Sequence, residues 1–269
     1  MIDLMSNYRD EGWWGGEDRS QDRLTLLSLV RNNTLDLKLA ALLWLLVEKK
    51  SSIIVAAGPR LLGKTTLLTA IVDFMPPSFE RIFTRGQSED FSFLPETDAS
   101  NTYILVPELS DHTPDYLWGD SVRTLFEAME EGYSMVATIH ADSAEEVVDM
   151  LEGPPLHLSH SLITNLHAVV NLCMVYGENG ILRRVNKVTL VSPGPEFTAL
   201  ARWEADEDTL VHDDSSATQA KVKARLGMAS GELAADLARR AETLDAWLKD
   251  DTIDADKLRE LIIKHYESR

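Results

Sequence analysis

The chain has 269 residues, of which 44% are hydrophobic, and this composition suits one sizeable α/β domain with a smaller unit. The formal net charge of −18 argues against nucleic acid as a partner, because a phosphate backbone requires a basic stripe. The single cysteine, Cys173, indicates a reducing cytoplasm, and the longest strongly apolar stretch, residues 39–47, is too short for a transmembrane segment.

The first 33 residues are polar and predict an N-terminal tail or the remnant of a domain. Within them, Trp13 and Trp14 form either a binding patch or, in the simpler interpretation, an anchor to the body or to a neighbouring subunit. Thr34 is then expected to cap a helix that leads into the first strand. The apolar face of this helix is expected to comprise Leu35, Leu39, Leu42, Leu43 and Leu46.

The chain is organised around the segment that follows this helix. Residues 53–57 predict a buried strand and residues 65–74 a helix, and between them the sequence matches G-x-x-x-x-G-K-[ST], a phosphate-binding loop. Such glycines let backbone N–H groups point at phosphate oxygens, at the positive end of the helix. We expect Lys64 to reach the β- and γ-phosphates of a nucleotide and the Thr65 hydroxyl to bind Mg²⁺. The expected nucleotide-binding residues are Gly58, Pro59, Arg60, Leu61, Leu62, Gly63, Lys64, Thr65 and Thr66.

A carboxylate at the end of a strand is the second candidate feature. Residues 81–84 predict a strand, the acidic segment 85–101 predicts a loop, and residues 103–108 predict a strand that ends in Glu108. Pro107 cannot donate to a sheet ladder, so pairing is expected to stop there. In a phosphate-loop fold an acid at this place holds Mg²⁺ through water or polarises the attacking water; the alternative is an ordinary acid at a strand end.

His140 is the third candidate feature. Thr113 and Pro114 are expected to open a helix, and residues 134–139 predict the strand that leads into the histidine. A lone histidine is usually structural. This one follows a strand that is expected beside the strand of Glu108, which favours contact with the γ-phosphate.

The remainder of the chain predicts an edge to the sheet and a group of helices. Residues 166–176 and 182–190 predict an antiparallel hairpin, to which residues 197–203 add a third strand. Antiparallel strands commonly extend a parallel sheet. From residue 215 onward the pattern is helical, and three helices with acid-rich surfaces are expected.

Together these segments resemble the secretion-superfamily ATPases, the hexameric motors of type II and type IV secretion, type IV and Tad pili and the archaellum. Residues 34–66 look like the linker helix, first strand and Walker A loop of that family. Residues 103–109 look like its Walker B strand, which ends in a glutamate, and residues 122–151 look like its histidine box. Residues 231–266 are similar to the helical C-terminal domain of the archaeal and Tad-type branch.

The resemblance implies an α/β fold with a RecA-like P-loop NTPase core of antiparallel edge strands (residues 34–212) and a small helical C-terminal domain (residues 213–269), after the remnant of residues 1–33. It implies hydrolysis of ATP with Mg²⁺, with Glu108 and His140 as catalytic residues. It further implies a ring, a hexamer in the family, formed with itself or with a paralogous ATPase. The implied partner is an inner-membrane platform protein of a pilus or secretion machine, which places the chain in the cytoplasm, peripheral to the inner face of the membrane.

Three departures from the family pattern leave other functions open. Ile82–Gln87 stands where the family has an acidic aspartate box, and Glu89, slightly displaced, is the candidate metal ligand there. Ser110 stands where an arginine follows the Walker B glutamate, and the N-terminal domain that supplies further arginines is much shortened. Arginines that remain in the short N-terminal segment are Arg19, Arg23 and Arg31. The alternatives to a motor are an ATP-binding regulatory or structural paralogue with little turnover, and a P-loop phosphotransferase, whose acceptor site is not recognisable.

Overall fold

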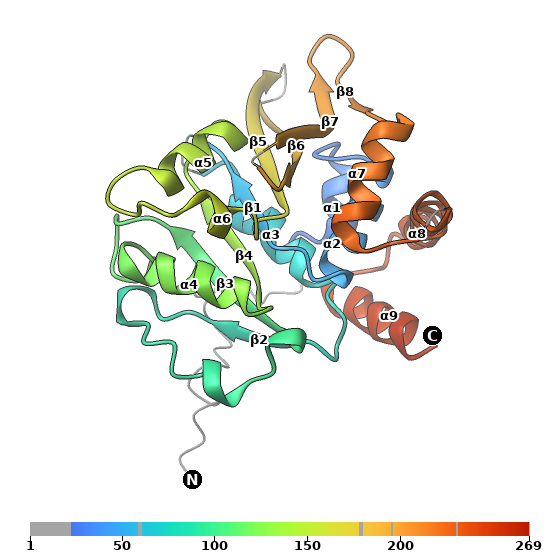
Figure 1. Cartoon of the computed structure of the whole chain (residues 1–269). Coiled ribbons are helices and arrows are strands. Elements are labelled where there is room, and N and C mark those ends of the chain that lie inside the picture. The colour runs from blue at the N-terminus through green and yellow to red at the C-terminus, as the bar shows by residue number, and fades with distance from the viewer. Residues whose placement is uncertain (1–22, 59–60, 178–179, 195, 230, 269) are drawn as a thin grey trace.

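The computed structural model describes residues 23–58, 61–177, 180–194, 196–229 and 231–268. The predictions for Trp13, Trp14, Arg19, Pro59 and Arg60 lie outside these residues. The described chain forms an eight-stranded sheet with the order β2-β3-β4-β1-β5-β6-β7-β8, and helices cover both of its faces (Figure 1). Among the described residues, no helix is long and apolar enough to cross a membrane.

Five neighbouring strands of the sheet run parallel. They are β1 (Ile53–Ala56), β2 (Glu80–Phe83), β3 (Thr102–Leu109), β4 (Ser134–Ile139) and β5 (Ala168–Gly177). The central strand β1 pairs with β4 on one side and β5 on the other, so that Ala56 is level with Ile139 and with Asn171. Because parallel strands end at the same edge of a sheet, the loop after β1 and the ends of β3 and β4 come together there.

Three antiparallel strands continue the sheet beyond β5. They are β6 (Gly180–Ser192), β7 (Glu196–Glu204) and β8 (Thr209–His212). The predicted hairpin and its third strand are therefore confirmed. The fourth strand, β8, was not predicted, because its four residues are too few for an alternating pattern to stand out.

The helices enclose a hydrophobic core on each face of the sheet (Figure 1). One face carries α1 (Leu26–Arg31), α2 (Leu37–Glu48), α3 (Lys64–Val72), α7 (Ser216–Leu226), α8 (Glu232–Leu248) and α9 (Ala255–Glu267). The other face carries α4 (Asp120–Glu130), α5 (Ala144–Glu152) and α6 (His160–Ile163). This architecture confirms the predicted RecA-like phosphate-loop core with antiparallel edge strands and C-terminal helices.

The burial of helix α2 goes beyond the predicted apolar face. The five leucines predicted for that face are all buried, although Leu35 precedes the helix. Every residue of Leu39–Val47 is buried. Helix α8 packs against α2, where Trp247 stacks on Trp44 with ring centroids 5.8 Å apart. Trp44 Nε1 also donates to the hydroxyl of Tyr266 in α9 at 2.8 Å. The C-terminal helices thus cover the side of α2 that the sheet does not.

Two helices begin later than predicted. Helix α2 is capped by Asp36 instead of Thr34, and the Asp36 carboxylate accepts the backbone N–H three residues further on at 2.7 Å. Helix α4 begins at Asp120 instead of Thr113. The delay has a cause in the sheet: Leu117 forms an isolated parallel bridge to the end of β3, which keeps the preceding segment out of the helix.

Pairing of β3 does not stop at Pro107 as predicted. The strand pairs with β4 up to Val106, shifts its register, and pairs again at Leu109. At the shift, the Thr138 hydroxyl donates to the Pro107 carbonyl at 2.6 Å. The irregularity accommodates the missing N–H of the proline, and it places Glu108 in the shifted part of the strand.

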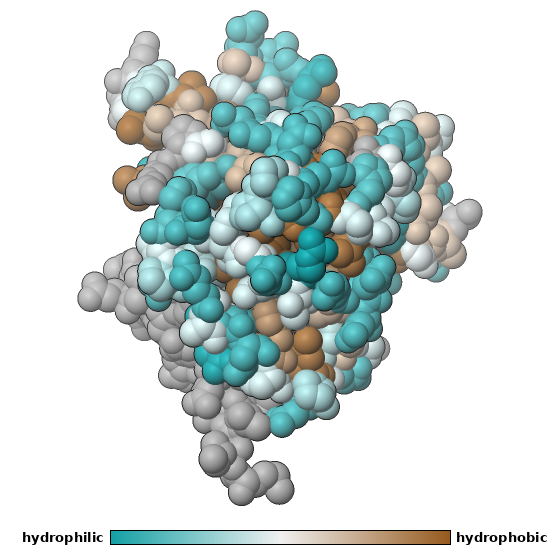
Figure 2. Space-filling view, turned by 60° about the vertical axis from the view of Figure 1, so that its left-hand side comes forward, coloured by the Kyte–Doolittle hydropathy of each residue, from teal (hydrophilic) through white to brown (hydrophobic). Residues whose placement is uncertain are grey.

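The acidic segment between β2 and β3 is irregular, as the sequence predicts. It contains three single-turn 3₁₀ helices, Gly86–Ser88, Leu94–Glu96 and Ala99–Asn101. The surface elsewhere is also mainly polar: on the face seen in Figure 2, hydrophilic residues predominate and hydrophobic residues show in separate patches between them. Such a surface agrees with the large negative charge of the chain.

Candidate functional site

The loop that follows β1 carries the phosphate-binding motif and leads directly into α3. Gly63 has a φ of +88°, a left-handed conformation that favours glycine, and α3 begins at the next residue, Lys64. Gly58 has little room for a side chain, because a Cβ there would lie 2.1 Å from Asp142 Oδ1. Leu61 lies between them with a φ of +62° and is 89% exposed. Leu61 and Gly63 therefore hold an unusual backbone conformation, and the Leu61 side chain faces solvent.

The side chains of Lys64, Glu108 and His140 meet beside this loop. Lys64 Nζ lies 3.1 Å from His140 Nε2, 3.2 Å from His140 Nδ1 and 3.6 Å from Glu108 Oε2. His140 Nε2 also lies 3.5 Å from Glu108 Oε1. The structure brings the three predicted residues together because β1, β3 and β4 are consecutive in the sheet. Lys64 follows the loop after β1, Glu108 lies near the end of β3, and His140 follows β4.

A backbone contact determines which nitrogen of His140 carries its proton. The Nδ1 atom lies 2.9 Å from the carbonyl oxygen of Gly58, which can only accept a hydrogen bond. Nδ1 is therefore the donor, and in the neutral ring Nε2 keeps its lone pair. That lone pair lies on the side of Lys64 and Glu108.

A cavity of about 780 Å³ opens beside the cluster. Its volume falls in the range of small-molecule sites, about 300–1,000 Å³. The wall is formed by the phosphate loop with the first turn of α3, by the ends of β3 and β4, and by the β5–β6 hairpin. The residues that line these parts of the wall include Leu61–Leu67, Glu108, His112, His140 and Ile181–Arg184.

The cavity wall offers oxygen ligands that fit Mg²⁺. This ion takes oxygen ligands and usually keeps several water molecules. Thr65 and Thr66 supply hydroxyl groups from the first turn of α3, and Glu108 supplies a carboxylate from the end of β3. Thr65 and Glu108 are the residues that would hold the ion, the carboxylate through water.

Glu89, the candidate metal ligand from the acidic segment, does not line this cavity. Its carboxylate is buried and accepts the backbone N–H groups of Arg85 at 2.9 Å and Phe91 at 2.8 Å. The Arg85 guanidinium lies 3.6 Å from it as well. In this structure Glu89 therefore shapes the turn after β2.

Arg183 was not singled out in the sequence, but it lies against the phosphate loop. Its guanidinium donates to the Leu61 carbonyl at 3.2 Å, and its Cδ is 3.4 Å from the place where a Cβ on Gly63 would be. The neighbouring Arg184 is engaged elsewhere, because it is buried and donates to both carboxylate oxygens of Asp208 at 2.6 and 2.8 Å. These hydrogen bonds hold the pKa of Asp208 well below its usual range. Which of the two arginines, Arg183 or Arg184, faces the phosphate loop depends on the register of the β5–β6 hairpin, which the sequence does not show.

His112 is the second residue that the sequence did not indicate. It lies in the connection between β3 and α4, and its Nδ1 is 4.0 Å from Glu108 Oε1. Its ring is 5.9 Å from that of His140, edge to face. A histidine in an irregular connection has no sequence signal, since its position depends on how the chain turns back at Leu117.

The described N-terminal arginines are engaged within the chain. Arg23 donates to both carboxylate oxygens of Asp73 at 2.7 and 2.9 Å. Arg31 donates to the carbonyl oxygens of Leu248 and Asp250 at 3.0 and 3.2 Å. Both side chains therefore tie the start of the chain to its own helices, and neither lines the cavity.

The strand order, the glycine loop before α3 and the charged cluster define a phosphate-loop NTPase fold. No family model matches the chain. The uncharacterized protein MJ1287 of Methanocaldococcus jannaschii is 27% identical over 240 residues, which cover 80% of this chain and 88% of that protein. A second uncharacterized protein of the same organism, MJ0900, is 24% identical over 277 residues, which cover 91% of this chain and 49% of that protein.

Two solved structures are similar at lower coverage. The VirB11 ATPase of the Brucella suis type IV secretion system has a TM-score of 0.41 and 20% identity, over 61% of this chain and 54% of that one. The Legionella pneumophila ATPase DotB has a TM-score of 0.38 and 14% identity, over 55% of this chain and 49% of that one. The chain thus spans about half the length of both solved chains, and these values do not establish a family for it.

Proposed function

We propose that this chain is a phosphate-loop ATPase that binds ATP with Mg²⁺ in the cavity beside α3 and hydrolyses it. The observation that supports this most is the cluster in which Glu108 and His140 both lie within 3.6 Å of Lys64 Nζ, at the wall of the cavity. A cation for the phosphates and a carboxylate that can accept a proton from the attacking water are the parts that phosphoryl transfer to water requires. The phosphate-loop motif supplies the cation, Lys64, and the end of β3 supplies the carboxylate, Glu108.

The ion pair between Lys64 and Glu108 suggests how nucleotide binding prepares the site. A triphosphate offers the Lys64 ammonium more negative charge than one carboxylate does, so Lys64 moves to the phosphates. Glu108 is then free to accept a proton from the attacking water. His140 presents Nε2 beside the same carboxylate, where it accepts a hydrogen bond from water or, once protonated, donates one to the γ-phosphate. Thr65 and, through water, Glu108 would hold Mg²⁺, which would supply positive charge to the phosphates.

Arg183 is the residue of this chain that we assign to the remaining charge at the transition state. It reaches the phosphate loop from β6, which lies on the other side of β1 from the strand of Glu108 in the sheet order. Negative charge spreads over the transferred phosphoryl group, and one lysine with one Mg²⁺ offsets only part of it. In this proposal Arg183 takes a place in cis that other ATPases fill with an arginine from a neighbouring subunit.

The finer part of the proposal is that the ATPase is a motor of the secretion superfamily, closest to its archaeal and Tad-type branch. The motif resemblance from about residue 24 onward supports it. In this proposal the chain forms a ring, a hexamer in the family, with itself or with a paralogous ATPase. It then acts on an inner-membrane platform protein at the cytoplasmic face of the membrane.

A second candidate function is an ATP-binding regulatory subunit with little turnover. The position of Glu89 favours it, because that acid is held by backbone N–H groups away from the cavity. Ser110 favours it as well, because its hydroxyl accepts the backbone N–H of His112 at 3.1 Å where the family has an arginine. Both candidates predict ATP binding, so hydrolysis is what separates them.

The test is phosphate release by the purified chain at saturating MgATP, measured beside calorimetric ATP binding. Binding with turnover supports the ATPase, and binding without turnover supports the regulatory subunit. Absence of binding contradicts both. Addition of a membrane-platform protein to the same assay tests the motor, for which we expect faster turnover.

A further inference from the structure

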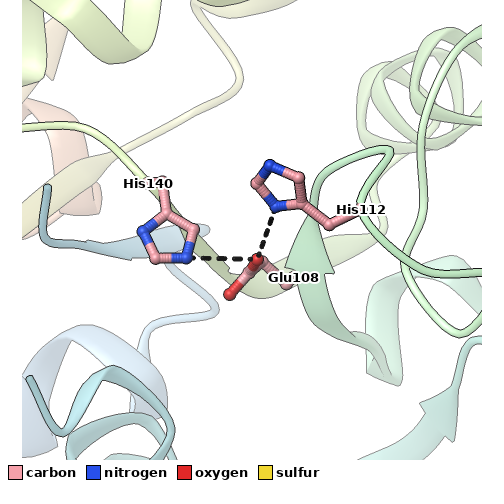
Figure 3. Close-up of side chains that lie close together, drawn as sticks. All are labelled: Glu108, His112 and His140. Carbon is pink, nitrogen blue, oxygen red and sulfur yellow. Dashed lines mark ion pairs between the residues drawn. The ribbon is translucent and has the colours of Figure 1, made fainter. Parts of the chain in front are cut away.

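We propose that Glu108, His112 and His140 form a binding site for one divalent transition-metal ion of the zinc type, distinct from the Mg²⁺ that accompanies ATP. The ligand atoms are Glu108 Oε1, His112 Nδ1 and His140 Nε2, which all lie within 4.8 Å of one another. In Figure 3 both rings turn a nitrogen toward the same carboxylate. Among the described residues, this is the group of three whose geometry suits a metal ion.

The spacing of the three atoms is close to that of a metal site. Zinc binds nitrogen and carboxylate oxygen at about 2.0–2.2 Å with tetrahedral geometry, which places neighbouring ligand atoms about 3.3–3.5 Å apart. Here Glu108 Oε1 is already 3.5 Å from His140 Nε2, and 4.0 Å from His112 Nδ1. His112, whose side chain is 46% exposed and lies in a connection, is the ligand that has to turn toward the other two.

The hydrogen bond between His140 and Gly58 prepares the histidine for this role. Histidines that bind metals usually donate their second ring N–H to a carbonyl or carboxylate, which fixes the tautomer and the ring orientation. His140 Nδ1 makes that contact with the Gly58 carbonyl at 2.9 Å. The other nitrogen, Nε2, is therefore the unprotonated one, and it is the one beside Glu108.

The chemistry of the three ligands selects the metal. Imidazole nitrogen suits zinc, copper, nickel and cobalt, whereas Mg²⁺ prefers oxygen. Two histidines with one glutamate form the ligand set of several catalytic zinc sites, in which the fourth position stays open. The site proposed for Mg²⁺, at Thr65, has oxygen ligands. The two sites share only Glu108.

Lys64 makes the proposed metal site and the nucleotide site interdependent. Its ammonium lies 3.1 Å from His140 Nε2 and 3.6 Å from Glu108 Oε2, so a metal ion at these ligands must push it away. A bound metal ion also occupies the carboxylate that is proposed to accept the proton from water. We therefore expect the ion to inhibit ATP hydrolysis, a consequence that rests on the proposed function, whereas metal binding itself does not.

The experiment consists of two titrations of the purified full chain without nucleotide. Zinc chloride binding is measured by calorimetry, and cobalt chloride binding is measured by visible absorption. The expected result is one saturable site per chain, with the visible bands of four-coordinate cobalt. Loss of an outer partner of a metal ligand typically weakens binding about 10–100-fold, so loss of a ligand in His112→Ala should weaken it by more than about 100-fold. His112→Gln keeps a polar side chain at this half-exposed position, and it should weaken zinc binding by a similar factor.

Two further variants sharpen the result. His157→Ala is the matched control, because His157 is an exposed histidine that does not line the cavity, and it should bind zinc like the parent. Lys64→Ala removes the competing ammonium and should strengthen zinc binding while it weakens ATP binding. The proposal is overturned if the parent has no saturable site, if both His112 variants bind zinc like the parent, or if His157→Ala loses the site. A chain that binds zinc but not ATP would refute the proposed function and leave the metal site standing.

Discussion

Lys64 and Glu108 form an ion pair across the phosphate loop, with Nζ and Oε2 3.6 Å apart and the two side chains only 6% and 11% exposed. The lysine comes from the first residue of α3 and the glutamate from the irregular end of β3. A buried pair of this kind leaves an uncompensated charge when either partner is removed. It also links the residue proposed to bind phosphate to the residue proposed to activate water.

Substitution Lys64→Ala should weaken ATP binding. It removes the cation proposed for the β- and γ-phosphates, and a charge-assisted hydrogen bond is worth about 1.5–3 kcal/mol, which corresponds to about 10–100-fold in affinity. Calorimetric titration with ATP measures this, and Lys49→Ala, at the end of α2, is the control that should bind like the parent. If Lys64→Ala and the parent bound ATP with equal affinity, the assignment of this loop as the phosphate-binding loop would be contradicted.

Substitution Arg183→Ala should lower turnover more than affinity. If Arg183 stabilises charge at the transition state, its loss should reduce kcat by about 10²-fold, the size of effect seen for one preorganised donor. If it merely supports the loop through the Leu61 carbonyl, the affinity for ATP should fall instead. Arg202→Ala, at an exposed arginine of β7 paired with Glu204, is the control for an unrelated loss of charge.

The elements that could be predicted from the sequence were those with a local pattern. The strand before the phosphate loop is a continuous apolar run, and Glu108 and His140 each end such a run, so all three could be placed before the fold was known. His112 and Arg183 could not, because their positions depend on a turn and on a strand register that only the folded chain defines. Thr34 and Asp36 are both good caps two residues apart, and local pattern does not choose between them.

The burial of α2 shows a second limit of local patterns. A helix rich in leucine predicts one apolar face against a sheet, but a later segment, α8, covers its other side. Arg240 of α8 takes part in this contact. It is 1% exposed, donates to Glu48 of α2 at 2.8 Å and to Asp236 of its own helix at 2.7 Å, and lies 4.9 Å from the ring centre of Trp44. A buried arginine has no reliable sequence signal.

Substitution Arg240→Ala should therefore destabilise the fold. It leaves Glu48 and Asp236 without their buried cation, and breaking such a pair costs about 3–5 kcal/mol; we expect the lower end, because both acids are slightly exposed. Denaturant unfolding measures the change. The adjacent Arg239, whose side chain is 56% exposed, also pairs with Asp236, and Arg239→Ala should cost less than about 1 kcal/mol. If Arg239→Ala and Arg240→Ala lowered the free energy of unfolding equally, burial of Arg240 would not explain its contribution to stability.

His167 should make the fold less stable in mild acid. Burial, and then the charge of Arg225, lower the pKa of His167 to about 3. The folded ring stays neutral while the unfolded one binds a proton below about pH 6.5, so the stability present above pH 6.5 is lost as the pH falls toward 3. Between pH 7.5 and pH 5 this residue should cost about 2 kcal/mol of unfolding free energy.

The variant His167→Asn tests this pH dependence, because an asparagine amide does not titrate. Its oxygen and its NH₂ group can serve the two backbone groups that lie beside His167 Nδ1, the Ser52 N–H at 3.2 Å and the Asn165 carbonyl at 2.9 Å. Its free energy of unfolding should fall less steeply between pH 7.5 and pH 5 than that of the parent. His157→Asn, at an exposed histidine, should keep the parent slope. Identical slopes for the parent and His167→Asn would show that His167 is not held neutral.

The most direct test of the central proposal is phosphate release at saturating MgATP by the parent, by Glu108→Gln and by Glu130→Gln, an exposed glutamate of α4. The amide of Glu108→Gln keeps the shape of the side chain but cannot accept a proton, so turnover should fall by about 10²–10⁴-fold. The affinity for ATP should stay near that of the parent, and Glu130→Gln should behave like the parent. A Glu108→Gln variant that releases phosphate at the parent rate would contradict the assignment of Glu108, and a parent that binds ATP but releases no phosphate would contradict the ATPase itself.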